Sequence, residues 1–217
     1  MAKVTGKLET IAAMRASGRD QAPFVMASGL TSMARAVVQV ETDTMQRVFD
    51  RPTPFTMRAV GMTPASKQSL QAQVFIKDAQ AKYLEAQVDG GARHLKTFEE
   101  RMTITAGQLV AIPGDQAPRN AYGNVGKAQL LKIIREGNTS GDARRYFYGR
   151  PRGSDLPAAI YARVNNNKQI VPLLVFASKA VYQKRFKFGE VAELTVRAQW
   201  VEHLSAAFRN ATSTARR

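Results

Sequence analysis

Arginines flank three consecutive aromatic side chains in one short segment of the chain, between residues 144 and 152. Arginines in such a segment can pair with phosphates, while aromatic rings can stack on bases or sugars. The segment therefore predicts contact with nucleic acid or with an acidic partner. The residues assigned to this contact are Arg144, Arg145, Tyr146, Tyr148, Arg150 and Arg152. The alternative is a half-buried aromatic strand whose arginines are merely solvated.

A second segment, residues 184–188, alternates cations with phenylalanine. Successive side chains of a strand point to opposite faces, so the two phenylalanines would face a core while the cations face outward. The cations assigned to this surface are Lys184, Arg185 and Lys187. Neither segment includes a zinc finger or an RNP-like aromatic signature. We therefore expect any nucleic-acid contact to be non-specific, made through phosphates, and sensitive to salt.

Groups suited to catalysis are few. The chain has no cysteine and two histidines, His94 and His203, which excludes thiol nucleophiles and thiolate zinc sites within it. It holds no Gly-x-Ser-x-Gly elbow and no phosphate-binding P-loop. Glu99 and Glu100 are adjacent, and adjacent helix positions point in different directions, so we interpret them as a solvated face. We expect no catalytic residue, no metal and no cofactor.

The charge balance of the chain is strongly basic. Among 217 residues, 32 Lys and Arg stand against 17 Asp and Glu, a formal net charge of +15. Such a surplus attracts polyanions, so it implies a negatively charged partner. The plainer alternative is a charge that serves solubility alone. We find no run of about 18 apolar residues and no signal-peptide stretch at the start, so we expect a cytoplasmic protein without membrane contact.

Two long amphipathic helices are predicted, one toward each end of the chain. Apolar residues recur at spacings of three and four from about Pro23 to Phe49 and again from about Gly189 to Ala211, which is helical periodicity. Prolines at 52 and 54 end the first helix. The residues assigned to the core or to contacts between copies are Met26, Leu30, Met33 and Val37 in the first helix and Leu194, Val201, Leu204 and Phe208 in the second.

Shorter elements are predicted between the long helices. Alternating or continuous apolar runs indicate strands at 55–62, 70–77, 108–113, 158–164 and 169–176, of which the first two and the last two form hairpins. Consecutive asparagines at 165–167 suit the turn of the last hairpin, because Asn tolerates positive φ. Short helices are predicted at 79–87, 95–102 and 127–135, and residues 8–15 form a short helix or an edge strand.

The order of these elements predicts the fold class. A long helix, several strands with minor helices, and another long helix favour an α+β fold over a βαβ succession. We expect an antiparallel sheet packed by a long N-terminal helix and a long C-terminal helix. A length of 217 residues is compatible with one large domain, so we expect a single domain over residues 1–217.

Several features of the chain occur together in one known group of proteins. They are the initial segment Val4–Glu9, the Ala-rich helix Pro23–Phe49, the phrase Arg47–Thr56, the strand Leu70–Ile76, and the C-terminal hairpin and helix. In this layout the chain resembles phage minor tail proteins of the lambda protein Z type and, more loosely, the tail-completion proteins of long-tailed phages. Residues 79–155 depart from the shorter lambda-like protein, so the comparison implies an insertion or elaboration there.

The resemblance implies a virion structural protein of the tail or neck, which completes the tail or joins it to the head around the DNA path. Its implied partners are copies of itself in a ring, expected to be a hexamer, other tail or neck proteins, and DNA bound non-specifically. Its implied location is the virion, after assembly in the host cytoplasm. Two alternatives stay open: a nucleic-acid-binding protein outside any virion, and an enzyme such as a nuclease or a peptidoglycan-active tail component.

Overall fold

The computed structural model of the protein describes residues 2–5, 21–96, 98–100, 109–137 and 145–214. The chain divides into two compact units. Unit 1 comprises residues 1–89 and 184–217, and unit 2 comprises residues 90–183. The single domain expected from the sequence is thus replaced by two units. Unit 2 lies between the two parts of unit 1 in the sequence. It differs at both ends from the expected range 79–155, because α4 (78–88) belongs to unit 1 and residues 156–183 belong to unit 2.

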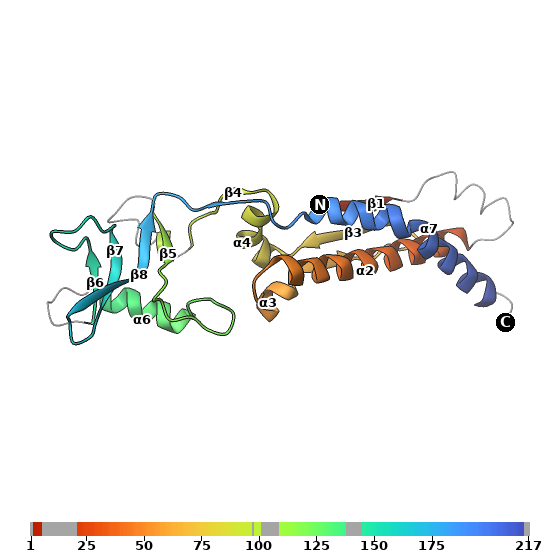
Figure 1. The fold of residues 1–217 in the computed structure, drawn as a ribbon. Helices are drawn as coiled ribbons and strands as arrows, with labels where there is room; N and C mark the ends of the chain where they lie inside the picture. The colour runs from red at the N-terminus through yellow and green to blue at the C-terminus, as the bar shows by residue number, and fades with distance from the viewer. Residues whose placement is uncertain (1, 6–20, 97, 101–108, 138–144, 215–217) are drawn as a thin grey trace. The chain divides into compact units, whose positions relative to one another are not determined.

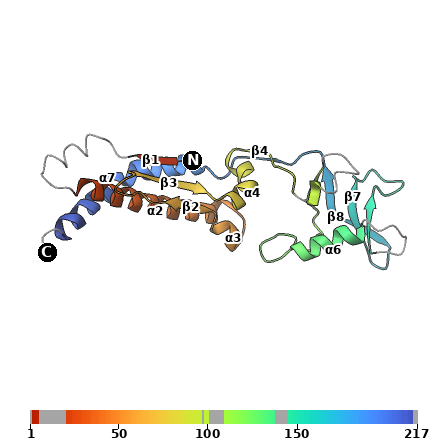
Figure 2. The same cartoon turned by 180° about the vertical axis from the view of Figure 1, so that it is seen from behind.

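Two long helices form the centre of unit 1. α2 spans Ala22–Val48 and α7 spans Phe188–Thr214, close to the predicted bounds. The helices lie side by side in both views (Figures 1 and 2). They run antiparallel: Ser32 Oγ lies 2.8 Å from Nδ1 of His203, while the later Glu41 of α2 lies near the earlier Ala192 of α7.

A three-stranded antiparallel sheet packs with these helices. Its strands are β1 (Ala2–Thr5), β2 (Val60–Thr63) and β3 (Gln71–Ile76), in the order β1-β3-β2. Ala72 and Val74 of β3 are buried in the same core as α2, as the alternation predicted. The α+β fold, with antiparallel strands packed by a long helix near each end of the chain, is confirmed.

The apolar stripe of α2 lies in the core of unit 1. Its predicted residues, Met26, Leu30, Met33 and Val37, are at most 1% exposed. α2 packs against the sheet on one side and against α7 on another, so its large side chains fill the space between three elements. The apolar stripe of α2 therefore coincides with its buried face.

The segment before α7 confirms the predicted alternation but is not a strand. Phe186 is fully buried and meets Phe49 edge-on, with ring centroids 5.8 Å apart. The backbone N–H groups of Arg185 and Phe186 both donate to the carbonyl of Gln87, at 2.9 Å each. Residues 184–187 therefore lie beside the end of α4 without joining a sheet.

The predicted strand at 55–62 is partly wrong. A helical turn, α3 (Pro54–Met57), precedes β2, because the Thr53 side chain accepts a hydrogen bond from the Thr56 N–H at 3.1 Å and Pro54 suits the first turn. The hairpin with β3 is confirmed from Val60 onward. The helix predicted at 79–87 is confirmed as α4 (Asp78–Val88).

The buried face of α7 is not the predicted stripe. Leu194, Val201 and Phe208 are 65%, 73% and 45% exposed, and Leu204 is only partly buried. The buried residues of α7 are mostly small instead: Phe188, Ala192, Thr195, Ala207 and Ala211. Gly29 of α2 lies against Leu204, where an added Cβ would come within 3.4 Å of the Leu204 Cα. The two helices approach closely, and small side chains allow that approach.

Unit 2 is built on a four-stranded antiparallel sheet in the order β5-β8-β7-β6. The strands are β5 (Val110–Pro113), β6 (Tyr146–Gly149), β7 (Ala159–Val164) and β8 (Gln169–Ala177). α6 (Lys127–Gly137) packs on β6 and β7, with Ile133 fully buried. A short ribbon pairs β4 (Gly91–Ala92) with β9 (Val181–Tyr182).

The predicted elements of unit 2 are largely present. The β7–β8 hairpin turns at the three asparagines, whose φ angles are 51°, 54° and 67°. Of the helix predicted at 95–102, residues 98–100 are helical. The element predicted at 8–15 lies outside the described residues. Among the residues that are described, no helix combines the length and apolar character needed to cross a membrane.

Candidate nucleic-acid interface

β6 carries the basic and aromatic segment, and its pairing with β7 decides where each ring lies. Tyr146 stands opposite Ala162, and Tyr148 stands opposite Ile160. Tyr146 is only 4% exposed and belongs to the core of unit 2. Tyr148 is 42% exposed and meets Phe176 edge-on at 5.6 Å. Tyr148 is therefore the ring of this pair that keeps a surface open to a base or sugar.

Phe147 points to the other face of the sheet and is already covered. Its ring stacks on Tyr161 with centroids 5.5 Å apart, and the Arg163 guanidinium lies 4.4 Å from the Phe147 centroid. Cation–π contacts of this kind stabilise the face locally. The sequence does not predict the contact of Arg163 with Phe147, because Arg163 lies on β7 and reaches Phe147 only through the pairing of β6 with β7.

The arginines of the segment lie at the surface of unit 2. Arg145, Arg150 and Arg152 are exposed, and the Arg145 guanidinium lies 5.5 Å from the Tyr146 ring centroid. Arg144 lies outside the described residues. The segment thus combines both interpretations considered for it. Tyr146 is buried and Phe147 is partly buried, while Tyr148 and the arginines are exposed and can meet a base or a phosphate.

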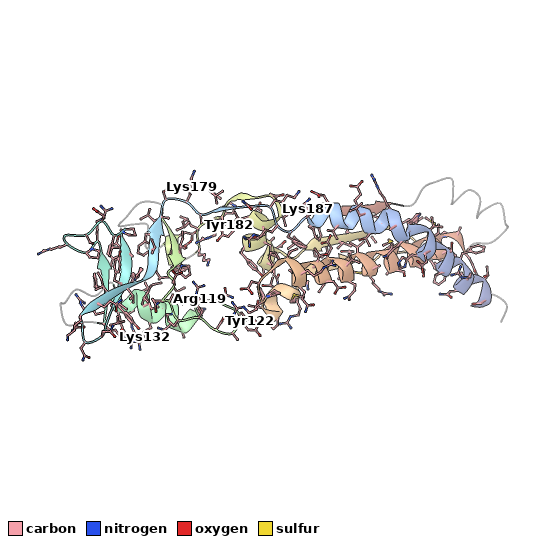
Figure 3. All side chains as sticks on the ribbon, in the orientation of Figure 1. Arg119, Tyr122, Lys132, Lys179, Tyr182 and Lys187 are labelled. Atoms are coloured by element: carbon pink, nitrogen blue, oxygen red, sulfur yellow. The ribbon has the colours of Figure 1, made fainter. Side chains whose placement is uncertain are left out.

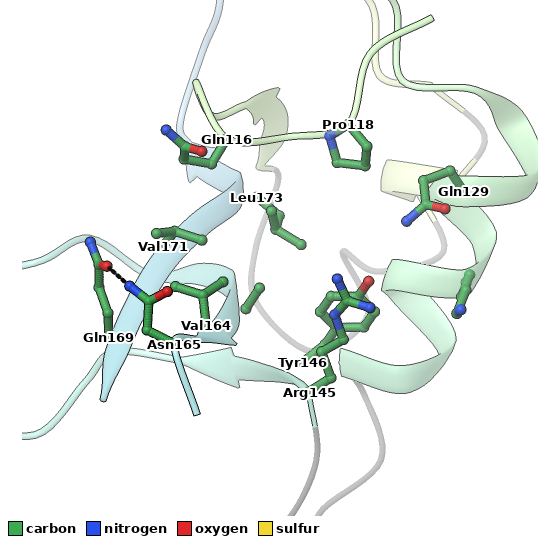
Figure 4. A pocket seen from close by; sticks show the side chains of 12 residues that line it. Gln116, Pro118, Gln129, Arg145, Tyr146, Val164, Asn165, Gln169, Val171 and Leu173 are labelled. Atoms are coloured by element: carbon green, nitrogen blue, oxygen red, sulfur yellow. Dashed lines mark hydrogen bonds between the residues drawn. The ribbon is translucent and has the colours of Figure 1, made fainter. Parts of the chain in front are cut away.

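A cavity of about 670 Å³ lies beside Arg145, between α6 and the strands β7 and β8 (Figure 4). Its apolar wall comes from Val164, Val171 and Leu173. The polar side chains at its edge are two cations and four amides: Lys132, Arg145, Gln116, Gln129, Asn165 and Gln169. Within the amide group, Asn165 Nδ2 donates to Gln169 Oε1 at 2.8 Å.

The composition of this cavity suits an anion that also has an apolar or planar part. None of the described residues that line it is an Asp or Glu, so none of them repels a phosphate. Arg145 offers a planar fork of donors and Lys132 a point charge, which are the two usual phosphate-binding groups. The apolar wall would meet a sugar or base edge. The composition therefore favours a phosphate-bearing ligand over a neutral one.

Sequence reasoning missed the contribution of α6 to this cavity. Lys132 lies on α6, as Figure 3 shows, and the Gln129 side chain comes from one turn earlier on the same helix. A lysine on an amphipathic helix is usually a solvated residue, so the type and spacing of Lys132 do not indicate a binding role. Only the packing of α6 beside β6 brings it to the same cavity as Arg145.

The second predicted set of cations belongs to unit 1. Lys184, Arg185 and Lys187 are all exposed. The ammonium groups of Lys184 and Lys187 lie 2.9 and 3.2 Å from the carboxylate of Glu190, at the start of α7. These hydrogen bonds hold the pKa of Glu190 below its ordinary value. Because each lysine is partly neutralised, this set offers a weaker anion site than Arg145 and Lys132.

The interpretation of Glu99 as part of a solvated face is wrong. Glu99 is 1% exposed and accepts hydrogen bonds from Arg93, Lys96 N–H and Ala111 N–H. Glu100, its neighbour, is exposed as expected. Arg93 is therefore engaged within the protein, which removes it from the cations that could meet a phosphate.

Two further observations bear on function. Within the described residues, no group of three or more His, Asp or Glu side chains gathers closely enough to hold a metal ion. Comparisons with protein-family models, with curated proteins and with solved structures find no match to this chain. The function is therefore inferred from the charge, the cavity and the layout of the elements.

Proposed function

We propose that this chain is a structural protein of a phage tail or neck, which completes the tail or joins it to the head, and that unit 2 faces the DNA. Contact with DNA is proposed because of the cavity of unit 2. Two cations and four amides border this cavity, and none of its described lining residues is a carboxylate. The exposed Arg150 and Arg152 extend the same positive surface. Such a surface binds phosphates without reading bases.

The assembly part of the proposal comes from unit 1 and from the resemblance. The long helix α2 and the strand β3 correspond to the Ala-rich helix and the strand that carry the likeness to minor tail and tail-completion proteins. In this role the chain has no catalytic activity and acts by joining neighbours. Its partners are further copies in a ring, proposed to be a hexamer, and other tail or neck proteins. Bound DNA offsets the repulsion among copies that carry +15 each.

Quantitative mass spectrometry of purified phage particles tests this proposal. We expect the chain in a fixed ratio to the major tail protein, and we expect particles assembled without it to show unjoined heads and tails by electron microscopy. Finding the chain only in the host cell and in no particle would refute the virion role.

A free nucleic-acid-binding protein is the second candidate. It is favoured by one observation: the exposed arginines and the cavity all belong to unit 2, so phosphate contact needs no second copy. The two candidates differ in where the chain accumulates. Duplex DNA binding by the chain together with its absence from particles would select the free protein.

A further inference from the structure

The exposed face of α7 carries a regular apolar stripe. Leu194, Val201 and Phe208 are spaced by seven residues and are 65%, 73% and 45% exposed. Between them lie Ala198 and Ser205, so apolar or small residues follow one another at intervals of four and three. An exposed apolar row of this length on a soluble helix marks a contact surface.

This stripe lies opposite the face that α7 buries in unit 1. At 100° per residue, the stripe residues fall within a narrow arc, and the buried Ala192 and Ala207 fall roughly on the other side of the helix. α2 therefore does not cover the stripe. The spacing of seven residues is that of a coiled-coil seam, and the stripe from Leu194 to Phe208 is roughly 21 Å long.

The charges beside the stripe indicate what would occupy it. With Leu194, Val201 and Phe208 at the d positions of a heptad, Arg197 takes a g position and Glu202 the e position five residues later. Two parallel copies in register would bring Arg197 of each copy to Glu202 of the other. An antiparallel pair centred on Val201 would instead bring Glu202 near Glu202, which like charges disfavour.

We propose that the exposed face of α7 binds the same face of a second copy of this chain, as a parallel, in-register helix pair. Ala198 and Ser205 at the a positions leave room for the two helices to approach. Arg197 already meets Glu193 of its own helix at 2.5 Å, but its side chain is 72% exposed and its guanidinium has further donors for Glu202 of the other copy.

The pairing deepens the assembly part of the proposed function, because it supplies one contact through which copies of the chain would join. It requires neither DNA nor a virion. A purified chain that fails to pair but is found in particles would refute the pairing and leave the virion role standing. A chain that pairs but is absent from particles would refute the virion role and leave the pairing standing.

Cysteine crosslinking of the full chain tests the pairing, since the chain has no cysteine of its own. The variants Leu194→Cys, Val201→Cys and Phe208→Cys place one thiol at each d position. In a parallel, in-register pair each thiol faces its own counterpart, so all three variants should form disulfide-linked dimers under mild oxidation. Val181→Cys, which replaces a residue of β9 that is 65% exposed, is the matched control and should stay monomeric.

Charge reversal checks the register by sedimentation. Arg197→Glu and Glu202→Arg should each weaken the dimer by about tenfold or more, and the double variant should restore it. Crosslinking of Val201→Cys alone would indicate an antiparallel pair and overturn the proposed arrangement. A chain that stays monomeric at high concentration, with none of the three thiols crosslinked, would overturn the pairing itself.

Discussion

Arg93 holds Glu99 through two hydrogen bonds, of 2.7 and 2.5 Å, inside unit 2. The Glu99 side chain is fully buried and that of Arg93 is 10% exposed. Glu99 also accepts from the backbone N–H of Lys96 at 2.6 Å and of Ala111 at 2.8 Å. One carboxylate thus ties β5 to residues 93–96, which form no helix or strand of their own.

Replacing Glu99 should destabilise unit 2 strongly. Glu99→Gln leaves the Arg93 cation buried without its partner, so the free energy of unfolding should fall by about 3 kcal/mol. Amide hydrogen exchange in β5 and β8 measures this decrease directly. Glu100→Gln, a change at the exposed neighbour, is the control and should leave the exchange of both strands unchanged.

The same pair predicts how unit 2 responds to acid. Burial alone would raise the pKa of Glu99, but the hydrogen bonds from Arg93 and from the two amides outweigh it and hold the pKa below the ordinary value of 4.5. The stabilisation is therefore complete above about pH 4.5 and is lost as the pH falls through the lowered pKa. Exchange protection of β5 should drop in that range, and protection that persists unchanged to pH 2 would contradict the assignment.

Glu41 predicts the opposite response in unit 1. It is fully buried on α2, and among the described residues neither carboxylate oxygen has a hydrogen-bond partner. Burial raises the pKa of Glu41 from 4.5 to about 8, an effect that the nearby Ala192 amide only partly offsets. From pH 4.5 to 8 the folded state keeps a proton that the unfolded chain has released, so stability should fall by up to about 1.4 kcal/mol per pH unit.

Urea unfolding followed by Trp200, the single tryptophan and a residue of unit 1, measures that fall. Glu41→Leu should remove the pH dependence and raise the free energy of unfolding most at pH 8, because no charge is then buried. Asp43→Asn, an exposed change on the same helix, is the matched control and should keep the slope. A wild-type stability that is flat between pH 5 and 8 would mean that Glu41 titrates normally.

The surface arginines of unit 2 should govern DNA binding. Changing Arg145, Arg150 and Arg152 together to Gln should weaken binding to duplex DNA of any sequence. It should also lower the slope of log affinity against log salt by about 0.9 for each phosphate that the variant no longer neutralises. Fluorescence anisotropy over a salt series measures both quantities, and Lys132→Gln should show a smaller effect of the same kind.

A matched control for this experiment removes three exposed cations from unit 1 instead: Arg35, Lys82 and Arg209. It lowers the net charge equally, so an equal decrease in affinity would show that total charge matters and the unit 2 surface does not. An unchanged salt slope in the unit 2 variant would refute the assigned contact.

The sequence predicted the elements better than it predicted their contacts. α2 was placed within about a residue at each end, and the turn at Asn165 followed from the tolerance of Asn for positive φ. The turn at Pro54 was misread as strand, because a cap at Thr53 overrides the β propensity of the residues after it. For the candidate site, the arginines were identified and Lys132 was not, since it joins them only through the packing of α6.

Residue type and spacing by themselves determined the α+β class, the two long helices, the basic character and the alternation of buried rings with exposed cations. Tertiary structure alone decided which side of α7 is covered. Periodicity alone identifies a stripe of large apolar residues on α7, yet α2 packs against another side of the helix, where Gly29 lies beside Leu204 and Ala207. Leu194, Val201 and Phe208 are consequently left exposed, because α2 packs against the other side of α7.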